Sequence, residues 1–154
     1  MHPSPSRRTI RIPARLSLLW LLIFLQGCLS LSLTHYDHTT YTNLTRLKAE
    51  TMLLLNSFDQ KAVAENQAAV ATTTLNLQAA YEYESGKGEE NRDMVKQFDQ
   101  IMQLFQQDVR DYQENGPGAF GKRYFQEAAR TLGQAFDIAI ATENSKNPDR
   151  GLKP

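Results

Sequence analysis

The sequence predicts an all-α protein, an up-and-down antiparallel bundle of four helices. Three observations support this fold class. First, no Gly or Pro interrupts the stretch from Thr40 to Glu84, which permits helix throughout. Second, later segments on either side of the turn sequence Asn115-Gly116-Pro117-Gly118 carry apolar residues at helical spacing. Third, the predicted connections are short, and short connections favour antiparallel neighbours.

The first 27 residues are expected to be a secretory signal peptide. Residues 1–15 carry four arginines and no acidic residue. An apolar run, Leu16–Leu25, follows and is interrupted only by Ser17. A basic start followed by a short apolar run is the pattern of a secretory signal.

The next residues, Leu25-Gln26-Gly27-Cys28, resemble the lipobox of bacterial lipoproteins. The resemblance lies in a Leu three positions before the Cys and a small residue directly before it. It implies a diacylglyceryl thioether on Cys28, cleavage after Gly27 and acylation of the new amino terminus. Cys28 is the only cysteine of the chain, and two or more acyl chains hold a protein durably in a bilayer. We therefore expect Cys28 to be a lipidation site, through which the protein is anchored in a membrane.

An uncleaved membrane anchor is the alternative to lipidation, and ordinary secretion is a third possibility. The stretch Leu16–Leu33 is almost entirely apolar. At about 1.5 Å per residue it would reach roughly 27 Å, which barely crosses a bilayer. Leu29 follows the cysteine at the position where an Asp favours the inner membrane. By resemblance to Gram-negative lipoproteins, we expect a protein of the bacterial cell envelope, on the outer membrane and facing the periplasm. The alternative location is the inner membrane, with the anchor uncleaved.

The mature chain is expected to begin with a tether, residues 28–38, because this segment is short, rich in Ser and Thr, and unlike a helix. The bundle domain is expected to cover residues 39–143. Residues 144–154 are polar, contain Pro and Gly, and are expected to be disordered. The tether holds the one cluster of metal-ligand residue types, His35-Tyr36-Asp37-His38. A polar tether in which Asp37 or Thr39 caps the next helix is the preferred interpretation, since a stable metal site needs supporting contacts.

The stretch from Thr40 to Glu84 is predicted to form two helices. In its first part the apolar positions are Tyr41, Leu44, Leu47, Thr51, Leu55 and Phe58. In its second part they are Val63, Val70, Thr74, Leu77 and Tyr81. The second set is displaced by about one residue, or roughly 100° around the axis. Ser57-Phe58-Asp59-Gln60 has the form of a capping box, so we place the break near Ser57. A three-helix bundle with a long, bent first helix is the alternative.

Two further helices are predicted after Gly86-Lys87-Gly88. The first carries the clearest stripe of the chain: Met94, Phe98, Ile101, Phe105, Val109 and Tyr112. The last is predicted from about Ala119 to Thr142. Its apolar positions are Phe120, Tyr124, Ala128, Leu132, Ala135 and Ala139, widened by Phe125, Phe136 and Ile140. Gly133 inside this helix is expected to permit close packing, because Gly costs about 1 kcal/mol relative to Ala there.

The residue types argue against catalysis, and we expect no catalytic, cofactor or metal site. No histidine follows His38, which removes the usual general base and the common histidine-activated nucleophiles. The carboxylate pairs Glu82 with Glu84 and Glu89 with Glu90 are expected to be solvated. Without the four arginines before Cys28 the chain is mildly acidic, which argues against a nucleic-acid partner.

The function expected from these observations is a non-enzymatic binding or structural module, with an envelope protein as a possible partner and Tyr83 as a candidate contact residue. The alternative is a carrier of a small apolar ligand or lipid, which requires a cavity among four rings: Phe98, Phe105, Phe125 and Phe136. Short segments such as Leu47–Glu50 and Ala80–Tyr83 are slightly similar to small exported helical bacterial proteins of unknown function. This similarity implies no active site.

Overall fold

The computed structural model of the chain describes residues 35–121 and 123–151. The predicted signal peptide, Cys28 and the tether up to residue 34 lie outside the described residues. None of the helices within the described ranges has the length and apolar character needed to cross a membrane.

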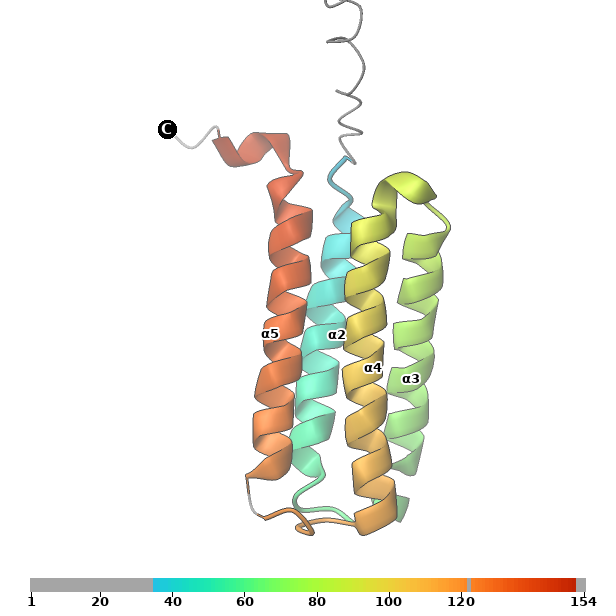
Figure 1. The fold of residues 1–154 in the computed structure, drawn as a ribbon, viewed down its shortest axis with the longest axis vertical. Coiled ribbons are helices and arrows are strands. Elements are labelled where there is room, and N and C mark those ends of the chain that lie inside the picture. The colour runs from blue at the N-terminus through green and yellow to red at the C-terminus, as the bar shows by residue number, and fades with distance from the viewer. Residues whose placement is uncertain (1–34, 122, 152–154) are drawn as a thin grey trace, which may run out of the picture. The chain divides into compact units, whose positions relative to one another are not determined.

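Four α-helices run side by side in the described part of the chain (Figure 1). They are α2 (His38–Ser57), α3 (Val63–Ser85), α4 (Arg92–Asn115) and α5 (Tyr124–Ser145). Short 3-10 helices, η1 (Glu89–Asn91) and η2 (Pro148–Gly151), precede α4 and follow α5. Helix α2 packs against α3 and α5, and α4 packs against the same two helices. The prediction of an all-α bundle of four helices is confirmed, and the three-helix alternative is wrong.

The two ends of the bundle differ in character. We call the end formed by residues 35–40, 83–92 and 142–147 the entry end, because the described chain begins there. Asp37, before α2, bonds to Glu143 near the end of α5. The opposite end, which we call the far end, contains residues 57–62, 112–121 and 123–125. There the Tyr112 hydroxyl donates to the Lys61 carbonyl at 2.7 Å.

Helix α4 supplies the largest part of the core, and its predicted stripe is confirmed at every position. All six of its stripe residues are buried. The opposite face carries Gln and charged side chains that are mostly exposed. This agreement follows from the strong segregation of large apolar from polar side chains around the helix axis. The same core cluster includes Leu44, Leu47, Leu55, Phe58, Leu77, Phe125, Leu132 and Phe136 from the other three helices and their ends.

The break between the first two helices lies where the sequence places it, but its capping is different. Helix α2 ends at Ser57, whose hydroxyl donates back to the Leu54 carbonyl at 2.6 Å. Ser57 therefore does not cap α3, and the predicted capping box is wrong. The contact that begins α3 comes from Glu65, whose Oε2 accepts from the Ala62 N–H at 2.9 Å.

Helix α3 buries a face that coincides only in part with the predicted one, and Val63 and Tyr81 of the predicted face are partly buried against the core. Val70 and Leu77 are buried as expected, but Thr74 is exposed. Asn66 and Thr73 are buried instead. The Asn66 amide donates to the Tyr112 hydroxyl at 3.0 Å, and the Thr73 hydroxyl donates to Glu50 at 2.9 Å. Polar side chains can occupy a core position when a hydrogen bond compensates for lost water.

The last helix starts later and ends later than predicted. Helix α5 begins at Tyr124, because the preceding turn holds Gly118 and Gly121 at φ of 76° and 92°, outside helical geometry. Phe120, predicted on the core stripe, is therefore in this turn and is 46% exposed. Helix α5 extends to Ser145 and η2 covers Pro148–Gly151, so most of the described part of the predicted disordered tail has helical structure.

Gly133 lies where α5 and α2 pack most closely. A Cβ atom at this position would stand 2.9 Å from the sulfur of Met52, closer than such contacts occur. The glycine is buried in the middle of α5. The expectation that Gly133 permits close packing is confirmed, and Met52 of α2 is the side chain that uses the space.

Candidate functional site

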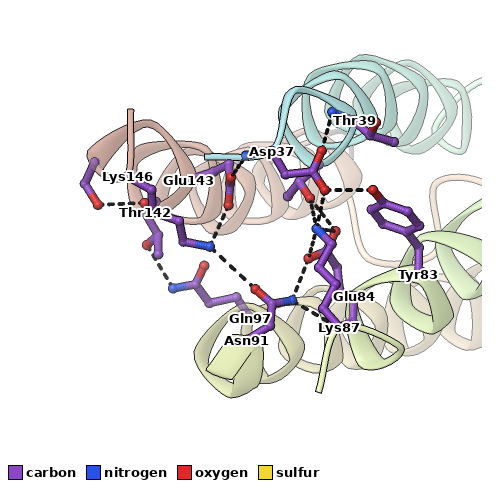
Figure 2. A network of polar contacts seen from close by, with 12 residues as sticks. Asp37, Thr39, Tyr83, Glu84, Lys87, Asn91, Gln97, Thr142, Glu143 and Lys146 are labelled. Carbon is purple, nitrogen blue, oxygen red and sulfur yellow. Dashed lines mark hydrogen bonds and ion pairs between the residues drawn. The ribbon is translucent and has the colours of Figure 1, made fainter. Parts of the chain in front are cut away.

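The candidate site is a network of polar side chains at the entry end (Figure 2). It joins the segment before α2 to the ends of α3 and α5 and to η1. Two of its carboxylates, from Glu84 and Glu143, are fully buried. We call it the entry-end network, and its members are Asp37, Thr40, Tyr83, Glu84, Lys87, Asn91, Glu143 and Lys146.

Asp37 is held from several sides. Its Oδ1 accepts from the Thr39 N–H at 2.7 Å, which caps α2 as the sequence suggested. Its Oδ2 accepts from the Tyr83 hydroxyl at 2.7 Å and pairs with Lys87 Nζ at 2.7 Å. Its own N–H donates to Glu143 Oε1 at 2.6 Å. The point where the chain enters the bundle is therefore fixed to both α3 and α5.

The charges around Asp37 keep this contact ionised. Burial acts to raise the pKa of Asp37, but the hydrogen bonds from Lys87 and Tyr83 outweigh it and hold this pKa well below its ordinary value. Burial likewise acts to lower the pKa of Lys87, but Asp37 and Glu84 outweigh it and raise this pKa. A lowered carboxyl pKa contributes stability that is present above the ordinary pKa and lost only in strong acid. The Asp37 contact therefore persists throughout the neutral range.

Glu84 is the centre of the network and corrects a prediction. Its side chain was expected to be solvated beside Glu82, yet it is fully buried. Its carboxylate accepts from the Thr40 hydroxyl at 2.6 Å, and Lys87 Nζ bonds to both oxygens at 3.0 and 3.1 Å. The Asn91 amide donates to Glu84 Oε2 at 2.7 Å. A buried charge is tolerated only when it is paired and hydrogen-bonded, and Glu84 meets both conditions.

Glu143 repeats this arrangement on α5. It is also fully buried, and its Oε2 accepts from Lys146 Nζ at 2.7 Å. Lys146 Nζ also lies 3.5 Å from Asn91 Oδ1. Since Asn91 donates to Glu84 and Lys146 donates to Glu143, the side-chain amide of Asn91 connects the two buried carboxylates. Glu143 was not predicted as a site residue, because the last helix was expected to end at Thr142. One signal could have found both acids: each ends an apolar stripe and has a Lys three residues later.

Two other candidates lie beside this network. Tyr83, expected as an exposed contact residue, is 41% exposed, and its hydroxyl is engaged by Asp37. The ammonium group of Lys87 lies 4.4 Å from the centre of its ring. His35 and His38 are exposed and border a hollow of about 450 Å³. Among the described residues, no group of three or more His, Cys, Asp or Glu side chains is placed to share a metal ion.

The far end is built from stacked aromatic rings. Phe58 and Tyr112 stack with ring centres 3.9 Å apart, and Phe125 meets Phe58 edge-on at 5.3 Å. All three side chains are fully buried. They come from the end of α2, the end of α4 and the start of α5, so one cluster holds three helices together at this end.

Asp108, near the far end of α4, provides a prediction of pH dependence. Burial and the nearby charge of Asp111 raise the pKa of Asp108 to about 6. A folded-state pKa above the ordinary value means that ionised Asp108 destabilises the fold at neutral pH. This penalty disappears as pH falls through 6 towards 4. We expect Asp108→Asn to raise the melting temperature at pH 7.5, by a gain that shrinks towards zero at pH 4.5, measured by thermal unfolding.

The control for this prediction is Asp99→Asn, which changes an exposed carboxylate on the same helix. It should leave the melting temperature almost unchanged at both pH values, because exposed substitutions have small effects. An equal gain from Asp108→Asn at both pH values would contradict the assignment to Asp108 ionisation.

The rings proposed to enclose an apolar ligand are instead part of the packed core. Phe98, Phe105, Phe125 and Phe136 are exposed by 1% or less. Two larger grooves of the described residues, of about 720 and 610 Å³, lie along α3 and are lined by none of these rings. The carrier alternative finds no support in either groove.

The carboxylates, ammonium groups and amide of the entry-end network mainly bind one another, so the network can hold the helix ends in fixed positions. The arrangement therefore orders the start of α2 against the ends of α3 and α5. Comparison with known proteins shows no relative: a scan against protein-family models, a search of curated proteins and a search of solved structures each found no match.

Proposed function

We propose that this protein is a lipoprotein of the bacterial envelope, anchored by acylated Cys28, whose bundle is a non-enzymatic binding or structural module. The observation that carries the proposal is the fixed entry point of the chain. Asp37 lies nine residues after Cys28 and is bonded to α3 and α5 as well as capping α2. A lipid on Cys28 would thus be connected to a point that several helices hold.

The length between the lipid and the bundle sets the distance from the membrane. Nine residues span at most about 30 Å when fully extended. The entry end would therefore stay within that distance of the bilayer surface. We propose the periplasmic face of the outer membrane as the location, with an uncleaved anchor in the inner membrane as the alternative.

A role without catalysis is supported by how the polar groups are used. Glu84 and Glu143 are each bonded to a Lys, and Asp37 is bonded to Lys87. Beyond His38 the chain has no histidine. A surface of mixed charge with an acidic excess fits contact with another envelope protein better than contact with nucleic acid.

The test of this proposal is Cys28→Ala in a Gram-negative host fed an alkyne analogue of palmitate. We expect the wild type to carry the label and to lack residues 1–27. The variant should carry no label and should keep the signal segment, because the cleaving enzyme acts after lipid transfer. The matched control is Ser32→Ala, which leaves the lipobox intact and should be labelled and shortened like the wild type. If the wild type kept residues 1–27 and carried no label, the result would contradict lipidation and support the uncleaved anchor.

A further inference from the structure

The outward side of α3 carries one exposed leucine in an uncharged setting. Between Asn66 and Tyr81 the helix has no charged residue, although 22% of the chain is charged. Leu75 on this side is 68% exposed, and Leu53 on the neighbouring α2 is 76% exposed. The two leucines border opposite flanks of α3, and exposed apolar surface of this kind occurs at protein contact sites.

Grooves run along both flanks of α3. The groove towards α2 has a volume of about 720 Å³, and Leu53, Ala68 and Thr72 are among its lining residues. The groove towards α4 has a volume of about 610 Å³ and is lined in part by Ala71 and Leu75. The outward side of α3 is thus a ridge of short side chains between two hollows, and an approaching helix could come close to its backbone.

We infer that this surface binds a second copy of the chain, with the two α3 helices antiparallel. A two-fold axis between Ala71 and Thr72 brings Leu75 opposite Ala68 of the other copy. The same axis brings Glu82, near the end of one α3, towards Lys61, which lies two residues before the start of the other α3. All of these residues are exposed. In a two-fold interface every such contact occurs twice, so Leu75 of each copy lies against Ala68 of the other, beside the groove towards α2.

The charges select the second copy and its direction. Lys61 forms no ion pair with the described residues, and among these residues the Glu82 carboxylate accepts from the Gln78 amide alone, at 2.7 Å. Antiparallel packing pairs Lys61 with Glu82 at both ends of an uncharged centre. Parallel packing would bring Lys61 against Lys61 and Glu82 against Glu82. Exposed ion pairs add little affinity, but they determine orientation.

This inference goes beyond the proposed function and does not depend on acylation of Cys28. The antiparallel arrangement brings the two entry ends to opposite ends of the dimer. Since nine residues reach at most about 30 Å, both anchors can enter one bilayer when the helices lie along it.

The test is photo-cross-linking of the full chain in membranes, with p-benzoylphenylalanine at position 75. We expect a product of twice the chain mass, whose cross-linked peptide includes Ala68. The matched control carries the probe at Ile138, an aliphatic residue of α5 that is 62% exposed, and should give no such product. A product with another protein, or a dimer yield at position 138 equal to that at position 75, would overturn the inference.

Charge reversal in the same assay tests the direction. Glu82→Lys and Lys61→Glu should each reduce the dimer product at least fivefold, and the two together should restore it. A cross-link from position 75 to the residues around position 75 of the other copy, with no effect of reversal, would instead show a parallel dimer and contradict the antiparallel inference. Helix content measured by circular dichroism should be unchanged in all three variants, since both residues are exposed.

Discussion

Replacing Glu84 by Ala is expected to lower the free energy of unfolding by about 3 kcal/mol, the lower part of the range for breaking a buried ion pair. The carboxylate is fully buried and binds Thr40, Lys87 and Asn91. Its loss would leave Lys87 with Asp37 as its one remaining carboxylate partner, the Asn91 amide with the carbonyl of residue 84 alone, and the Thr40 hydroxyl without its acceptor. Chemical denaturation monitored by circular dichroism measures the change.

Two further variants isolate the cause. Glu82→Ala makes the same change two residues away, at an exposed position, and should cost less than about 0.5 kcal/mol. Glu84→Gln keeps an acceptor for Thr40 but removes the charge that pairs with Lys87, so its loss should lie between the other two. If Glu84→Ala and Glu82→Ala had equal effects, the entry-end network would not contribute to stability as described.

Replacing Phe58 by Ala is expected to lower the free energy of unfolding by about 3 to 5 kcal/mol, the cost typical of removing a buried aromatic ring. The ring is fully buried and contacts both Tyr112 and Phe125. Its removal would leave a cavity where α2, α4 and α5 meet, and would also remove two aromatic pairs. The same denaturation experiment measures this loss.

Phe120→Ala is the matched control for Phe58→Ala. It removes the same ring at the same end of the bundle, but from a turn position that is 46% exposed. We expect a loss of less than about 1 kcal/mol, since much of this ring remains in water in the folded state. A loss for Phe120 comparable to that for Phe58 would show that the aromatic cluster extends into the turn.

The sequence predicts the fold best where large apolar residues lie on one side of a helix and polar residues on the other, because only one side can then be buried. The stripe of α4 from Met94 to Tyr112 was complete because Gln and charged residues fill the other side. Helix α3 could not be read in this way, since its apolar residues are scattered around the axis. Its buried side depends on Asn66 and Thr73, whose partners Tyr112 and Glu50 are distant in sequence.

The candidate site shows the same limit. The capping role of Asp37 could be predicted because it depends on Thr39, two residues away. Burial of Glu84 could not, since Thr40 lies 44 residues away and reaches the carboxylate only after α2 and α3 pack. An acidic residue at the end of an apolar stripe is expected to be solvated unless a distant hydrogen-bond partner, such as Thr40 for Glu84, is known. The Lys three residues later was the one local sign of an ion pair.

The central claim, that Cys28 carries the lipid by which this bundle is anchored, is tested most directly by the mass of the amino-terminal peptide. The protein would be purified from membranes in detergent and digested, and its first peptide analysed by mass spectrometry. We predict a peptide that begins at Cys28 and carries a diacylglyceryl group and an additional acyl chain. A peptide that begins at the initial Met, or one that begins at Cys28 with a free thiol, would contradict the claim.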